Sequence, residues 1–185
     1  AQAYWDSLRP TAPQLPQHDS VTLPLFDVTR TTVANVITIG AKAANLGEMY
    51  TVGVGTGHAL PLPDRPLAIP FAHYARHLAS AGVLPLIDAV IADYQAGALG
   101  QGELEQRLFA IRWRIYTAPI DPALVAQVTT LGRARWADTT KLRFRSSTNV
   151  EDLAEFTGAG LYTSAGVRLG DGDAALGNAI KTVWS

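Results

Sequence analysis

Apolar residues recur along much of the chain at the three- and four-residue spacing of helices. The clearest case is Leu104, Leu108, Ile111 and Ile115, which fall at i, i+4, i+7 and i+11 and precede Pro119. This period predicts an amphipathic helix that ends before the proline. Further helices are predicted to begin at Gly40 and near Pro70, and another has Pro85 in its first turn. Two more are predicted to follow the N-caps Asp121 and Asp173.

A different pattern, strict alternation, marks residues 141–145. Leu142 and Phe144 alternate there with charged residues, which is typical of a half-buried strand. Short strands interleaved with helices indicate an α+β (mixed α/β) fold, and the length predicts one domain. We place this domain at residues 31–185. Residues 1–30 carry four prolines and are predicted to be a leader or linker, with Val21–Val28 as a possible strand.

The strand at 141–145 opens the segment with the most informative chemistry. Arg145 is followed by Ser146, Ser147 and Thr148, and a glycine loop comes later at Thr157, Gly158, Ala159 and Gly160. Glycine lets the backbone approach an anion, successive N–H groups can surround it, and arginine fits phosphate oxygens with two parallel hydrogen bonds. The residues alone favour a plainer interpretation, a surface arginine before a hairpin turn, because short glycine patterns match by accident.

A second cation, Lys42, falls in the first turn of the helix predicted from Gly40. Lys42, Leu46 and Met49 share one face, which we take to be the inward one. A helix N-terminus attracts anions through its unpaired N–H groups and its dipole, so Lys42 could meet a phosphate there; a lysine snorkelling at the core rim is the alternative. Residues 51–66, rich in glycine and proline, are predicted to be a loop whose glycine spacing does not fit a dinucleotide fingerprint.

Composition narrows the classes of protein. Hydrophobic residues make up 48% and charged residues 17%, as in a globular chain. The net charge of −1 gives no general attraction to nucleic acid or membrane, so neither is an expected partner. The absence of cysteine excludes disulfides, and no signal peptide is visible, so a cytoplasmic location is expected.

His73 and His77 are four residues apart, a spacing that could share a metal ion, but they lack a nearby third ligand. We therefore expect a solvated or core-edge pair.

Three segments resemble one protein family. RFRSSTNVEDL followed by FTGAGLYTS is similar to the nucleotide-binding N-terminal domain of the pyruvate phosphate dikinase and phosphoenolpyruvate synthase family, in its water-dikinase-like form. GAKAANLGEM resembles the family's lysine-bearing G-x-K-x-x-N-L segment, and LAIPFAHYARHL resembles its P-x-x-x-I-P-x-x-x-Y segment. The resemblance covers about residues 36–185. One departure is Ile39-Gly40-Ala41 where the family often has paired glycines, which we expect to loosen phosphate contact.

The resemblance implies the first lobe of an ATP-grasp-like domain that takes ATP and Mg²⁺ as cofactors. It implies that the phosphates of ATP are bound by Lys42, Arg145, Ser146, Ser147, Thr157, Gly158, Ala159 and Gly160. It assigns no catalytic residue and no metal ligand to this chain, since the metal ligands of the family belong to the second lobe. The expected partners are therefore ATP, a second nucleotide-binding lobe, and the phosphohistidine domain of a longer protein.

The implied reaction belongs to that longer protein. ATP donates a phosphoryl group to a protein histidine, which passes it to an acceptor such as pyruvate or a glucan, and this chain alone is expected to be inactive. One alternative is a degenerate, non-catalytic lobe that senses nucleotide or assists assembly. Another is a purely structural domain with a hairpin at the glycine loop. The presence of both Lys42 and Arg145 favours the first interpretation, because a degenerate site would tolerate their loss.

Overall fold

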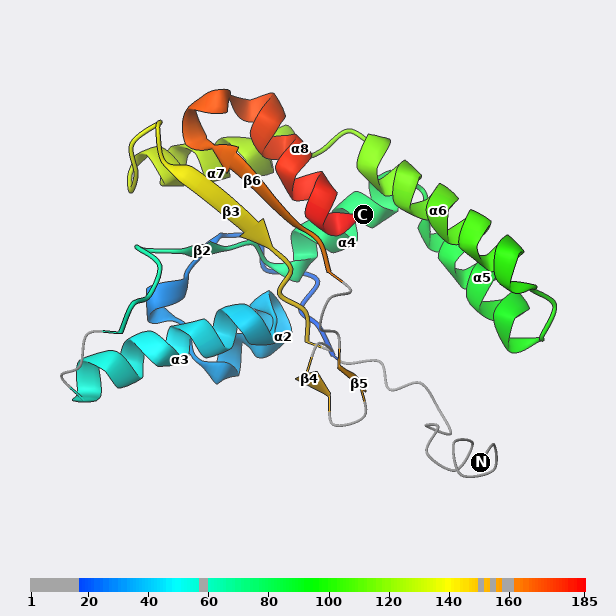
Figure 1. Cartoon of the computed structure of the whole chain (residues 1–185), viewed down its shortest axis with the longest axis horizontal. Coiled ribbons are helices and arrows are strands. Elements are labelled where there is room, and N and C mark those ends of the chain that lie inside the picture. The colour runs from blue at the N-terminus through cyan, green and yellow to red at the C-terminus, as the bar shows by residue number, and fades with distance from the viewer. Residues whose placement is uncertain (1–16, 57–59, 150–151, 154–155, 158–161) are drawn as a thin grey trace.

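The structure, a computed structural model, describes residues 17–56, 60–149, 152–153, 156–157 and 162–185. It confirms the α+β class, with helices packed around short antiparallel strand pairs (Figure 1). The helices are α2 (Val36–Ile39), α3 (Ala41–Thr56), α4 (Phe71–Ser80), α5 (Leu84–Gln95), α6 (Gln101–Thr117), α7 (Pro122–Arg133) and α8 (Asp173–Trp184). Short 3₁₀ turns cover Val28–Arg30, Val33–Asn35 and Leu169–Asp171.

In the part of the chain that the structure describes, the strands form three antiparallel pairs. They are β1 (Phe26–Asp27) with β2 (Leu67–Ala68), β3 (Lys141–Arg145) with β6 (Ser164–Arg168), and β4 (Asp152–Leu153) with β5 (Phe156–Thr157). The strand predicted from the alternation of Leu142 and Phe144 with arginines is thus confirmed. The possible strand at Val21–Val28 shrinks to β1, because Asp27 caps the 3₁₀ turn that begins at Val28.

The β3–β6 ribbon packs one face on α7 and α8, as Figure 1 shows. Leu142 lies opposite Val167 and Phe144 opposite Ala165, and these four apolar residues point into one cluster. Leu176 of α8 is fully buried in the same cluster. The alternation read from the sequence therefore sets which face of the ribbon is covered, and Arg145 is left on the opposite, exposed face.

Helix α3 differs from its prediction in its inward face and in its length. Leu46 and Tyr50 pack against the buried Val28 and Ile39, whereas Met49, predicted to be inward, is 45% exposed. The helix also continues to Thr56, so the first part of the predicted loop at 51–66 is helical. Residues 36–39 form the helical turn α2, which leads directly to Gly40 and α3.

Helices α5 and α6 form a hairpin that projects from the rest of the molecule (Figure 1). Ile111 and Ile115 of α6 are buried as predicted, but Leu108, expected on the same stripe, is 44% exposed. Leu108 does not belong to the buried cluster around Ile111 and Ile115, against which Leu104 of the same helix packs. Asp121 caps α7 as predicted, accepting a hydrogen bond from the Ala123 N–H.

The last helix begins where the sequence predicts, with a different cap. Gly172 occupies the N-cap position of α8, and Asp173 stands in the first turn, where its carboxylate accepts a 2.6 Å hydrogen bond from the Thr129 hydroxyl. Among the described residues no single helix is long and apolar enough to cross a bilayer, although α4 and α5 together, bent by 89°, reach that length and hydropathy.

Candidate functional site

The strand β3 carries Arg145 to the edge of the ribbon. Arg145 is the last residue of β3 and lies opposite Ser164 of β6. Its side chain is exposed and makes no hydrogen bond or ion pair with another described residue. The guanidinium is therefore oriented toward solvent with its five donors available to an anion.

The segment that follows Arg145 docks on the N-terminus of α3. The Ala41 N–H donates to the Thr148 carbonyl oxygen at 2.9 Å, and the Ala43 N–H donates to Ser147 Oγ, also at 2.9 Å. These two donors flank Lys42 in the sequence. The fold thus brings the backbone of the lysine-bearing turn against the loop that begins next to Arg145, although about a hundred residues separate them in the chain.

Gly40 makes this close approach possible. Its φ of +82° lies in the region that side chains disfavour, and a Cβ atom placed there would meet the Ser147 carbonyl oxygen at 2.1 Å. The turn at Gly40 is therefore tightly packed, while the expectation of looser phosphate contact at Ile39-Gly40-Ala41 stays a prediction. Ile39 before it is 1% exposed in the core, and Gly40 is in tight contact with Ser147.

The docking changes the expected role of the α3 N-terminus. A helix N-terminus usually leaves its first N–H groups open to an anion, but those of Ala41 and Ala43 are bonded to the 147–148 loop. Ser147 acts as a helix cap in this arrangement, since its oxygen accepts a backbone N–H while its own hydrogen can still be donated. Anion binding here must accordingly depend mainly on the Lys42 and Arg145 side chains.

One polar atom at this junction has no partner among the described residues. The hydroxyl of Thr148 is buried, and the structure gives it no hydrogen bond. A buried hydroxyl without a partner costs free energy, so a nearby phosphate oxygen would satisfy it. The donor set of Lys42, Arg145, Ser147 and Thr148 fits an acceptor-rich anion, and so it fits the polyphosphate of ATP.

The glycine loop can be placed only in part. Thr157, predicted as the start of the loop, belongs to β5 and pairs with Asp152 of β4. Gly158, Ala159 and Gly160 lie outside the described residues. The expectations for the loop as a cover over phosphates therefore remain predictions.

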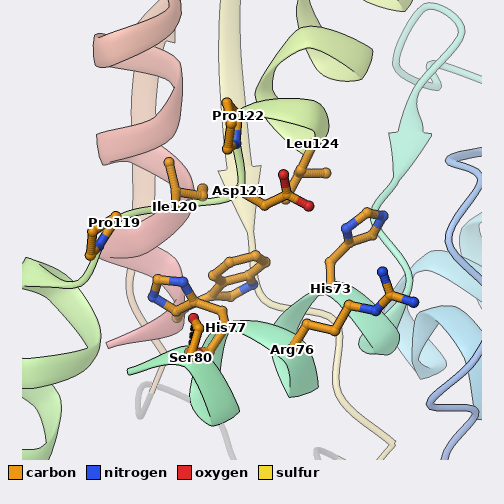
Figure 2. A pocket seen from close by; sticks show the side chains of 10 residues that line it. His73, Arg76, His77, Ser80, Pro119, Ile120, Asp121, Pro122 and Leu124 are labelled. Carbon is orange, nitrogen blue, oxygen red and sulfur yellow. Dashed lines mark hydrogen bonds between the residues drawn. The ribbon is translucent and has the colours of Figure 1, made fainter. Parts of the chain in front are cut away.

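A cavity of about 340 Å³ lies elsewhere, between α4, the segment joining α6 to α7, and the end of α8. Figure 2 shows His73, Arg76 and His77 on its α4 side, facing Ile120 and Asp121. His73 and His77 are both buried, and each ring Nε2 meets a backbone carbonyl oxygen, that of Leu23 at 2.7 Å and that of Ile115 at 2.8 Å. The two histidines are thus core residues that join α4 to its neighbours, rather than solvated ones.

This cavity and the Lys42–Ser147 junction are different places. The residues that line the cavity belong to α4, to 119–124 and to α8, and the predicted phosphate residues are not among them. Within the described part of the chain, no three histidine, aspartate or glutamate side chains gather closely enough to hold a metal ion. Of the two places, the junction is the one that contains residues predicted to bind phosphate.

Comparison with protein families gives a match over most of the chain. Residues 36–185 match the family described as pyruvate phosphate dikinase, AMP/ATP-binding domain. The chain belongs to this family. Residues 36–185 are accordingly a nucleotide-binding domain of the pyruvate phosphate dikinase type, as the motifs at Gly40, Leu67 and Arg143 indicated. Comparisons with curated proteins and with solved structures give no match.

In this dikinase-type domain, the sequence reasoning missed the structural roles of Gly40 and Ser147. No local pattern reveals that a serine caps a helix that begins about a hundred residues earlier, since capping rules consider only neighbouring residues. The signal that was available is the run of three hydroxyl residues directly after a strand, because such residues commonly bond backbone groups.

Proposed function

We propose that residues 36–185 bind ATP through the junction of α3 with the 146–148 loop, as the nucleotide-binding part of a phosphotransferase. Lys42 and Arg145 would neutralise oxygens of the triphosphate, and Ser146, Ser147 and Thr148 would orient the loop or donate to phosphate. The observation that carries this proposal is the pair of hydrogen bonds on either side of Lys42, from Ala41 to Thr148 and from Ala43 to Ser147. They hold the two cation-bearing segments together.

The reaction we infer is transfer of a phosphoryl group from ATP to a histidine on another domain, and from there to an acceptor. Phosphoryl transfer depends chiefly on positioning and on neutralising charge, which is what this part of the chain can contribute. Mg²⁺ would accompany ATP and share its charge. We propose that the metal ligands and the phosphohistidine belong to other parts of a longer cytoplasmic protein, and that this chain alone does not turn over ATP.

The affinity of the chain alone should be low. Charge-assisted hydrogen bonds contribute roughly 1.5–3 kcal/mol each, while association itself costs several kcal/mol. Two cations and a few loop donors therefore leave a surplus near −4 kcal/mol, a dissociation constant of ~1 mM. The test is calorimetric titration of the chain with ATP, with and without Mg²⁺.

Two variants give this titration its controls. Arg145→Ala should remove measurable binding, because arginine supplies the bidentate contact. Lys42→Ala should weaken binding less, since water replaces a point charge more easily. Arg112→Ala removes a similar exposed arginine from α6, where it bonds the Ser185 carbonyl oxygen, and should leave ATP binding unchanged. Failure of the wild-type chain to bind ATP at all would favour the degenerate, non-catalytic lobe.

A further inference from the structure

The exposed face of the β3–β6 ribbon carries only positive charge. On β3, Lys141, Arg143 and Arg145 alternate with the buried Leu142 and Phe144 and point away from α7 and α8. Residues directly opposite in an antiparallel pair share a face, and the register places Arg168 opposite Lys141. Neither strand contains an acidic residue. The face thus combines four cations without a carboxylate from the ribbon itself.

Two of these cations converge on one point. Gly166 lies opposite Arg143, and a Cβ atom built on Gly166 would lie 3.6 Å from Cε of Lys141 and 3.9 Å from Nη1 of Arg143. Both side chains therefore extend over the bare backbone of Gly166. Like charges that approach each other raise the free energy of the folded chain unless an anion lies between them.

The third donor at this point is a hydroxyl. Arg143 Nη2 donates to Ser164 Oγ, so the serine oxygen is used as an acceptor and its hydrogen can be donated elsewhere. The side chain of Lys141 makes no hydrogen bond or ion pair with any described residue. The groups around Gly166 consequently offer an ammonium, a guanidinium and an O–H, all of them donors.

We propose that Lys141, Arg143 and Ser164 form a binding site for a phosphate dianion above Gly166, next to the ATP phosphates at Arg145 but built from different side chains. Two converging cations match the double charge of a phosphate group better than the single charge of a carboxylate. The absence of a side chain at Gly166 leaves space for the phosphate oxygens. The dianion is either free phosphate or the phosphate monoester of a larger molecule, and the two sources share this chemistry.

The test uses NMR spectra of the ¹⁵N-labelled chain, titrated with inorganic phosphate or with phenyl phosphate. Potassium chloride keeps the ionic strength constant, and a titration with potassium chloride alone is the blank. The proposal predicts saturable shifts of the Gly166 and Ser164 amides with one or both phosphates and none with the blank. Tighter binding of phenyl phosphate indicates a monoester ligand, and tighter binding of inorganic phosphate indicates free phosphate. Equal shifts in the chloride blank would overturn the proposal.

Protonation provides a second measurement on the same chain. A phosphate monoester has a second pKa near ~6, so it is a dianion at pH 7.5 and mainly a monoanion at pH 5. Phenyl phosphate should therefore bind several-fold more weakly at pH 5. If the affinity for phenyl phosphate is as high at pH 5 as at pH 7.5, the site is not built for two charges.

Matched arginine variants separate this site from the ATP site. Arg143→Gln should weaken phosphate binding about tenfold or more, as expected for a lost charge-assisted contact, and should change ATP binding little. Arg145→Gln should weaken ATP binding and change phosphate binding little. Arg112→Gln should change the binding of neither ligand. If Arg143→Gln leaves phosphate binding unchanged, the assignment is wrong. If phosphate binds at Gly166 while ATP binds nowhere, the proposed function fails and this site stands.

Discussion

Ser147 Oγ accepts a hydrogen bond from the backbone N–H of Ala43 at 2.9 Å, across 104 positions of sequence. This contact joins the loop after β3 to the first turn of α3, and its two ends lie next to the residues we assign to phosphate. Ser147 therefore has a structural role in addition to any contact with ATP, and the two roles can be measured separately.

Ser147→Ala removes the cap and should lower the free energy of unfolding by about 1 kcal/mol, the usual value for a lost helix cap. Urea unfolding followed by circular dichroism measures this change. Ser20→Ala, at an exposed serine whose side chain makes no hydrogen bond with a described residue, is the control and should be neutral within about 0.5 kcal/mol. If the two variants have the same stability, Ser147 does not cap α3.

Gly40→Ala should be much more damaging than the same change at Gly172. The two glycines have almost the same backbone conformation, with φ and ψ of 82° and 162° at Gly40 and of 90° and 169° at Gly172. A Cβ at Gly172 meets no atom within 4 Å, whereas at Gly40 it meets the Ser147 carbonyl oxygen at 2.1 Å.

Both alanine variants should carry the backbone strain, about 1–3 kcal/mol, and Gly40→Ala should add roughly 1–3 kcal/mol from the clash. Chemical denaturation of the two variants gives the difference directly. A Gly40→Ala chain as stable as Gly172→Ala would mean that the 147–148 loop does not press on Gly40.

The stability of the chain should depend on pH through Asp19. Its pKa is lowered from 3.8 to about 2, first by a hydrogen bond from the Thr22 side chain and then by the backbone N–H groups of Val21 and Thr22. A carboxylate with a lowered folded pKa stabilises the fold above its unfolded pKa and loses that effect as the pH falls toward the folded value.

We therefore expect the contribution of Asp19 to be complete above pH 4 and to disappear between pH 3.8 and about 2. Unfolding midpoints of the wild type and of Asp19→Asn, measured across pH 2–5, should converge at the acid end and separate above pH 4. Asp27 and Asp64 also have lowered pKa values, so only the difference between the two chains reports Asp19. A constant difference from pH 2 to 5 would contradict the assignment.

Much of the architecture could be predicted from local patterns. Alternation of Leu142 and Phe144 with arginines indicated β3 and its buried face, and the Asp121-Pro122 pair gave the start of α7. These predictions succeed because cap chemistry and a two-residue period act over only a few positions.

The errors have tertiary causes. Met49 and Leu108 fit the apolar stripes of their helices, but tertiary packing leaves each of them about half exposed. The extension of α3 through residues 51–56 goes against the low helix propensity of glycine, a weak preference that tertiary contacts often override. In the candidate site, the sequence identified the residue types but could not reveal that the 147–148 loop occupies the α3 amides.

The central claim is that ATP binds where the 146–148 loop meets α3, and NMR mapping of ATP on the ¹⁵N-labelled chain tests it most directly. With ATP at this junction, the largest amide shifts should fall at residues 40–43 and 145–148 and vanish in Arg145→Ala, while Arg112→Ala retains them. Shifts that instead gather around His73, His77 and Trp184, and persist in Arg145→Ala, would place the nucleotide in the cavity and contradict the account.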